Sequence, residues 1–289
     1  RFLPAVGFGV ALPPHRSLAP SAGLSAAGPG RYDGSTMCGR FTLTASPEEV
    51  QALFGLLDLE AFPPRFNIAP TQPILLVVSG QPREPGSNLP DRRALLVRWG
   101  LIPSWAKNPK DLPLLINARS ETAAEKNAFR AAMRHRRALV PASGFYEWKR
   151  DGKKSTPYFV RPRGGGLVAF AGLMETYAEP SGSEIDTGAI LTTAANADVA
   201  AIHDRMPVVI QPSDYARWLD CRSQEPRDVA DLMRPAEPGF FEAIPISDKV
   251  NKVANTGPDI QAPIAVGEAP KAVASPEKAP KGDPQLKLF

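Results

Sequence analysis

Short strand-like segments dominate the sequence between residues 74 and 210, and few helical segments separate them. Runs of apolar and β-branched residues predict strands over residues 74–78, 94–99, 138–140, 145–149, 158–161, 167–173, 189–193 and 208–210. A doubly wound parallel sheet would place a helix after nearly every strand, so this pattern excludes that fold. We expect a single α+β domain with a β-barrel-like core and a few peripheral helices.

Two capping boxes predict helices beside this core. Ser46 and Glu49 begin a helix that extends to about residue 56, and Thr122 and Glu125 begin one over residues 122–133. Further helices are expected to start at residue 213 and near residue 227.

The two ends of the chain differ in composition from the centre. Residues 1–36 are rich in Ala, Gly, Pro and Ser, so we expect a leader or a mis-set start, with a processed targeting peptide as the alternative. Residues 258–289 are rich in Pro, Ala, Lys and Glu, which predicts a disordered tail. The folded domain is therefore expected to span residues 37–257.

Cys38 follows directly on Met37. If translation starts at Met37 and the methionine is removed, Cys38 carries a free α-amine and a thiol on neighbouring carbons. The amine can condense with an aldehyde to a Schiff base, which the thiol then closes to a thiazolidine ring. With residues 1–36 attached there is no free amine and this chemistry fails. The alternative is that Cys38 is an ordinary buried cysteine in a strand.

Composition limits the cofactors and the partners. The two cysteines and three histidines show no zinc-binding spacing, so we expect no metal, no cofactor and no disulfide framework. A net charge of +4 permits a polyanionic partner without requiring one. Basic runs over residues 126–137 and 149–154 are more often solvated faces than nucleic-acid sites.

Three polar residues stand in apolar or turn-like surroundings: Asn117, Glu147 and His203. The neighbours Tyr146 and Trp148 are expected to desolvate the carboxyl of Glu147 and raise its pKa toward general acid or base use. A histidine needs little tuning to transfer protons near neutral pH. The structural alternatives are a turn residue, an ion-pair partner and a satisfied core histidine, respectively.

An arginine stands two positions after the cysteine, the asparagine and the histidine, namely Arg40, Arg119 and Arg205. In an extended backbone, residues i and i+2 point to the same face, so each reactive group could share its face with a guanidinium. Guanidinium groups fit phosphate well, and the pattern therefore favours a phosphodiester substrate. Trp99 and Trp105 border a loop where rings could stack on unpaired bases, with core packing as the alternative.

Six motifs occur in order and cover about residues 37–257. They are Met-Cys-Gly-Arg-Phe at 37–41, Phe-Asn-Ile-Ala-Pro-Thr at 66–71, Arg-Trp-Gly-Leu-Ile-Pro at 98–103, Asn-Ala-Arg-Ser-Glu-Thr at 117–122, Gly-Phe-Tyr-Glu-Trp at 144–148 and His-Asp-Arg-Met-Pro at 203–207. Together they resemble the SRAP family, the SOS response-associated peptidases or abasic-site processing proteins.

The resemblance implies an SRAP-type domain that binds single-stranded DNA in a positively charged groove and forms a thiazolidine crosslink with the aldehyde of an abasic site. It implies catalytic roles for Cys38, Asn117, Glu147 and His203. It also implies DNA contacts from Arg40, Asn67, Trp99, Arg119, Trp148 and Arg205. We further expect a lyase-like monomer in the cytoplasm of a bacterium, near the nucleoid.

Two other functions stay open at this point. One is a thiol autopeptidase that exposes Cys38 by removing the residues before it. The other is a DNA-binding module that holds single strands without a covalent bond.

The last five residues suggest a second partner. Gln285, Leu286, Leu288 and Phe289 resemble the short peptide by which bacterial replication and repair proteins dock on the sliding clamp. The glutamine would supply hydrogen bonds and the three apolar side chains would fill a pocket. The alternative is that these residues pack back on the domain or do nothing.

Overall fold

The computed structural model describes residues 39–80 and 91–264. Cys38 and the C-terminal peptide at residues 285–289 therefore lie outside the described residues, and the roles expected for them stay predictions. Across the described ranges, no helix has the length and apolar character needed to cross a lipid bilayer.

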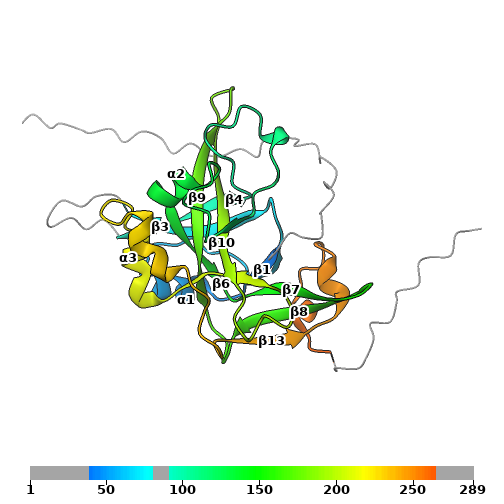
Figure 1. The fold of residues 1–289 in the computed structure, drawn as a ribbon. Helices are drawn as coiled ribbons and strands as arrows, with labels where there is room; N and C mark the ends of the chain where they lie inside the picture. Colours follow the sequence, from blue (N-terminus) through cyan, green and yellow to red (C-terminus); the bar gives the residue numbers. More distant parts are fainter. Residues whose placement is uncertain (1–38, 81–90, 265–289) are drawn as a thin grey trace, which may run out of the picture. The chain divides into compact units, whose positions relative to one another are not determined.

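Five strands close into a barrel (Figure 1). They are β3 (Pro73–Ser79), β4 (Arg92–Trp99), β6 (Arg137–Ala142), β9 (Val168–Ala178) and β10 (Glu184–Ala194). Antiparallel pairing runs from β4 through β3, β6 and β9 to β10, and a parallel pairing of β10 with β4 completes the ring. The α+β fold with a barrel-like core is confirmed.

Three short strands extend the barrel at its edges. β5 (Asn117–Arg119) pairs with β10 in parallel, and β11 (Arg205–Pro207) pairs with β10 on the antiparallel side. β12 (Val209–Ile210) pairs with β9. The C-terminal half of β10 is therefore bordered by two of the six sequence motifs.

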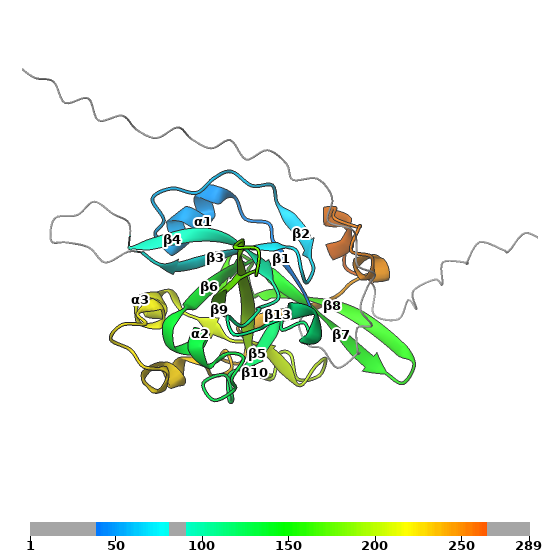
Figure 2. The ribbon, with the colours of Figure 1, turned by 90° about the horizontal axis from the view of Figure 1, so that it is seen from above.

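A second sheet of five antiparallel strands has the order β13-β8-β7-β1-β2. Its strands are β1 (Arg40–Leu43), β2 (Arg65–Ile68), β7 (Gly144–Asp151), β8 (Lys154–Pro162) and β13 (Phe241–Pro245). Both ribbon views show β7 and β8 continuing past β1 as a hairpin that projects away from the barrel (Figures 1 and 2).

Close packing explains why the barrel is built from small and β-branched residues. All six residues of β6 are buried, as are the first eight of β9. Gly172 on β9 leaves no room for a side chain, since a Cβ there would lie 2.9 Å from Cγ2 of Val140. A larger residue would force these neighbouring strands apart.

The helices agree with the sequence in part. α1 (Pro47–Phe54) begins at the expected capping box, in which the Glu49 amide donates to Oγ of Ser46 and the Ser46 amide donates to Oε2 of Glu49. α2 (Arg130–His135) begins eight residues later than predicted. The amide of Ser120 donates to the Thr192 carbonyl and Ala123 is fully buried, so this segment follows the barrel as a series of turns.

The C-terminal helices are short. α3 (Tyr215–Leu219) follows a 3-10 turn, η2 (Pro212–Asp214), and the helix expected near residue 227 is the 3-10 helix η3 (Pro226–Leu232). Three other 3-10 turns are η1 (Pro109–Asp111), η4 (Asp248–Asn251) and η5 (Pro258–Gln261). Ile260 is fully buried, so the packed chain continues past residue 257, the domain end expected from the sequence.

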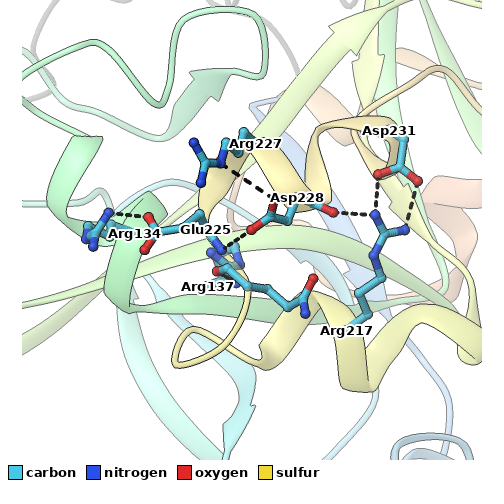
Figure 3. Close-up of polar contacts among 8 residues, drawn as sticks. Arg134, Arg137, Arg217, Glu225, Arg227, Asp228 and Asp231 are labelled. Carbon is cyan, nitrogen blue, oxygen red and sulfur yellow. Dashed lines mark hydrogen bonds and ion pairs between the residues drawn. The ribbon is translucent and has the colours of Figure 1, made fainter.

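Arg137 on β6 is a buried charge that holds the α3–η3 connection to the barrel (Figure 3). Its Nε donates to the Trp218 carbonyl at 2.7 Å and Nη1 to the Met133 carbonyl at 2.9 Å. Its Nη2 donates to the carbonyls of Asp220 and Gln224, both at 2.9 Å. These carbonyls lie at helix ends and in the following turn, where partial negative charge accumulates. Carbonyl dipoles therefore compensate the charge.

We predict that Arg137→Met destabilises the fold by about 3–5 kcal/mol, because several buried carbonyls lose their donor at once. Urea unfolding would measure the loss. Arg217→Met is the matched control, since Arg217 donates to Asp231 at the surface of the same cluster (Figure 3) and surface ion pairs contribute little. Equal losses from the two variants would contradict the role given to Arg137.

Candidate active site

Arg40 and Asn67 fasten the start of β1 to the segment after residue 249. Nη1 of Arg40 donates to Oδ1 of Asn67 at 2.8 Å and to the Val250 carbonyl at 2.7 Å. Nδ2 of the buried Asn67 donates to the Asn255 carbonyl at 2.9 Å. Both side chains, expected from the sequence to contact DNA, thus bind backbone carbonyls of the protein. These hydrogen bonds hold the start of β1 against the segment over residues 250–255.

Glu147 lies on β7 and is only 3% exposed, so the burial expected for it is confirmed. Across the sheet, Arg40 lies opposite Tyr146 and Phe41 opposite Phe145. β1 begins at Arg40, so its first residue lies opposite Tyr146, the residue that precedes Glu147. A buried carboxylate is thereby set beside the strand end that leads back to the candidate nucleophile.

Tyr146, which precedes Glu147, fixes β7 from its other face. The Tyr146 hydroxyl donates to the Phe66 carbonyl at 2.6 Å and accepts from Nε2 of Gln261 at 2.8 Å. Burial raises the pKa of Tyr146 to about 12, so the phenol stays a donor at neutral pH. Trp148 points to this same face, and its Nε1 donates to Oδ1 of Asn251 at 2.8 Å.

Asn117 and Arg119 lie on β5, beside β10. Asn117 is opposite Ile190 and half-buried, and Arg119 is opposite Thr192 with its side chain exposed. The backbone of this strand continues into the turns described above, where the Arg119 carbonyl accepts from the Ala123 amide. Of the three arginines expected to contact phosphate, Arg119 is exposed, Arg40 is half-buried and Arg205 is buried.

His203 lies in the loop before β11, with its side chain 23% exposed. Its Nδ1 accepts from the Arg205 amide at 3.1 Å, which assigns the proton of the neutral ring to Nε2. Nδ1 also lies 3.0 Å from Oδ1 of Asp204, a contact that only a protonated Nδ1 could use as a hydrogen bond. One nitrogen cannot serve both partners at once, so protonation of the ring would exchange the first contact for the second.

Arg205 is buried and forms a bidentate ion pair with Glu121. Nη1 and Nη2 donate to Oε1 and Oε2 of Glu121 at 2.5 and 2.7 Å, and Nη2 also donates to the Thr192 carbonyl at 2.7 Å. The side-chain hydrogen bonds from Arg205 lower the pKa of Glu121. Sequence reasoning missed Glu121, although it lies in the Asn-Ala-Arg-Ser-Glu-Thr motif. This pair ties the β5 segment to the His203 loop.

Trp99 is fully buried at the end of β4. Its Nε1 donates to the Ile116 carbonyl at 3.0 Å, and its ring meets Phe41 edge-on with centroids 5.1 Å apart. No face of the ring is open to a base, which contradicts the stacking role predicted for it. Trp105 is the exposed one of the two, at 50%. Trp99 instead joins β1 to the segment that begins at Asn117.

Cys221 lies beside the buried Arg137, whose backbone amide donates to the Cys221 sulfur at 3.4 Å. Burial raises the pKa of the Cys221 thiol, which makes it a poor nucleophile at neutral pH. The candidate site therefore depends on the other cysteine.

Comparisons with known proteins agree with the motifs. Residues 37–253 match the family described as SOS response associated peptidase (SRAP). The chain is 37% identical over 228 residues to the abasic site processing protein YoqW of Bacillus subtilis, covering 78% of this chain and 98% of that one. It is 33% identical over 237 residues to the abasic site processing protein YedK of Escherichia coli, covering 79% and 100%. The chain belongs to the SRAP family.

Solved structures show the same fold. A protein from Bacteroides thetaiotaomicron superposes with a TM-score of 0.65 at 23% identity, covering 79% of this chain and all of that one. A phage-related protein from Bordetella bronchiseptica gives a TM-score of 0.55 at 25% identity, covering 72% and 94%.

We predict that Glu121→Gln weakens the fold in a pH-dependent manner. Arg205 lowers the pKa of folded Glu121, so the pair contributes stability above the unfolded pKa, about 4.3, and loses it as the pH falls through the folded value. The difference in unfolding free energy between wild type and variant should be largest at neutral pH and shrink in acid. Glu242→Gln, which removes the Arg161 ion pair, is the control. Parallel pH profiles for wild type and Glu121→Gln would contradict the prediction.

Proposed function

We propose that this protein recognises abasic sites in single-stranded DNA and captures them covalently through an N-terminal Cys38. The register of β1 on β7 is the observation that carries the proposal, because it sets Arg40, the first residue of β1, opposite Tyr146, next to the buried Glu147. Cys38 precedes Arg40 by two residues in the sequence, and the proposal requires its amine to reach this carboxyl. The relatives named abasic site processing proteins support the same substrate.

The proposed reaction needs no oxidant or reductant. The α-amine of Cys38 adds to the aldehyde carbon of the ring-opened sugar, and loss of one water leaves a Schiff base. The thiolate then adds to the imine carbon, the nitrogen takes up a proton, and a thiazolidine ring results. Reversal follows the same steps backwards.

Glu147 and His203 are proposed to move the protons. Glu147 would protonate the departing hydroxyl as the Schiff base forms, a task suited to a carboxyl taken out of water. His203, with its proton on Nε2, would act at the sugar from the other sheet, and Asn117 would hydrogen-bond the adduct. The contacts of Trp99 with both Phe41 and Ile116 support this arrangement, because they join β1, the neighbour of the strand that carries Glu147, to the residue that precedes Asn117.

The proposed DNA contacts divide according to burial. Arg119 is exposed and is assigned to a phosphate. The half-buried Trp148, expected from the sequence to contact DNA, lies on the face of β7 opposite Glu147 and binds Asn251, so it is assigned a supporting role. Arg40, Asn67 and Arg205 already bind protein groups, so they act mainly by holding the site and by adding positive charge. The sliding clamp stays a proposed second partner, for a peptide that begins 21 residues beyond Ile264.

The first test is a crosslink. Protein that begins at Cys38 should form a denaturation-resistant complex with abasic single-stranded DNA and none with undamaged DNA, as judged by denaturing gel and intact mass. Cys38→Ala should abolish the complex and Cys221→Ser should keep it.

A protein with one glycine added before Cys38 keeps the thiol but loses the cysteine amine, so it should fail to crosslink. Equal crosslinking by this variant would overturn the proposed amine chemistry. Thiol-dependent removal of residues 1–36 by the full-length chain would support the autopeptidase. Tight DNA binding without any crosslink would support the non-covalent module.

The second test concerns proton transfer. Glu147→Gln and His203→Ala should each slow formation or reversal of the crosslink by roughly 10²-fold or more, the usual scale for losing a general acid or base. Non-covalent affinity should stay the same. Glu175→Gln is the matched control, since Glu175 is a comparably buried carboxylate on β9. If Glu147→Gln and His203→Ala both react at the wild-type rate, neither residue transfers protons and both have structural roles.

A further inference from the structure

The two basic runs noted in the sequence differ in how far the fold pairs their charges. In the run over residues 126–137, Arg134 pairs with Glu225, and Nη1 of Arg136 lies 3.6 Å from Oε1 of Glu175. Arg137 is buried and donates to backbone carbonyls. That run is largely neutralised within the fold. The run over residues 149–154 lies in the β7–β8 hairpin instead, beyond the point where β7 leaves the core.

The cations of the hairpin are exposed. Lys149, Arg150, Lys153 and Lys154 all reach solvent, and Asp151 is the acid among them. Ion pairs between residues within the described ranges lie elsewhere in the molecule. Four cations against one acid, on a two-stranded projection, make a surface with net positive charge.

The pleat of the hairpin sorts these cations onto two faces. Side chains two positions apart share a face, so Lys149 lies on the face of Glu147. Lys154 pairs with Asp151 across the hairpin and therefore shares that face too. Arg150 lies on the opposite face with Trp148.

The two faces have different neighbours. Phe145, on the same face as Glu147, packs in the barrel-side core, whereas Tyr146 packs against Ile246, Val250 and Ile260 on the other side. The barrel-side face is thus buried as far as Glu147 and becomes exposed at Lys149, where Lys149 and Lys154 outnumber Asp151, the acid on the same face. A strand bound with its reacting sugar at Glu147 would meet these lysines next.

We infer that the barrel-side face of the β7–β8 hairpin binds the phosphodiester backbone of the single strand that flanks the reacting nucleotide, through Lys149 and Lys154. The inference rests on the proposed function for the position of that nucleotide. Residues two apart in a strand are separated by about 7 Å, so the lysines extend the site outward in steps within reach of successive phosphates. Lysine ammonium groups are mobile point charges, which suits contacts that ignore base sequence.

The test measures non-covalent binding of the full chain to an undamaged single-stranded oligonucleotide. Fluorescence anisotropy gives the binding constant at each of a range of salt concentrations. The double variant Lys149→Gln with Lys154→Gln should reduce the slope of log K against log salt by about 1.4, which is two phosphate contacts on a single strand. Arg150→Gln removes one charge from the other face of the same hairpin and should leave the slope unchanged. Unaltered urea midpoints would show that the hairpin variants fold normally.

An unchanged slope in the double variant would overturn the inference. An equal loss per charge in Arg150→Gln would also overturn it, since the hairpin would then act as undirected charge. The outcomes separate from those of the proposed function, because this measurement needs neither an abasic site nor an N-terminal cysteine. If the double variant has a reduced slope but the protein never crosslinks, the hairpin surface is supported and the proposed covalent chemistry is contradicted.

Discussion

The indole of Trp99 is the contact on which the candidate site depends. Glu147 and the start of β1 belong to one sheet, and Asn117 and the His203 loop belong to the other. The ring of Trp99 packs against Phe41 from the first sheet, and its N–H binds the carbonyl of Ile116 beside the second. Edge-on aromatic packing and a buried hydrogen bond together fix the spacing of the two halves.

The segment over residues 250–261 also holds residues of the candidate site in place. Arg40, Asn67, Trp148 and Tyr146 all hydrogen-bond to groups between residues 250 and 261. Three of these contacts are made by residues before position 258, and the fourth is made by Gln261, in the stretch whose composition predicts a disordered tail. Because Arg40 and Asn67 bind the protein itself, the proposed DNA contacts are those of the exposed Arg119 and the hairpin lysines.

Local patterns were sufficient for the longer strands of the barrel, for the β7–β8 hairpin and for α1, because alternation and the Ser46–Glu49 capping box act over a few residues, but they did not predict β1, β2, β5, β11 and β13. They failed where distant contacts decide. Ser120 is anchored to Thr192, which turns the expected start of α2 into turns, and Arg205 finds Glu121 across 84 positions. Trp99 and Trp105 flank the same turn, so nothing nearby in the sequence tells which of them is buried. The motifs supplied the candidate site residues, while the partners of their side chains became visible only in three dimensions.

The barrel closes through one parallel pairing, in which Thr187 and Gly188 of β10 meet Arg98 and Trp99 of β4. These partners are about ninety positions apart, and joining them requires a long loop to close late in folding. During synthesis, β1 leaves the ribosome first, while β10 and the Gln261 segment leave it long afterwards. The polar framework around the start of the domain is therefore assembled after translation of nearly the whole chain, and a product truncated before residue 250 would carry β1 without the carbonyls that bind Arg40 and Asn67.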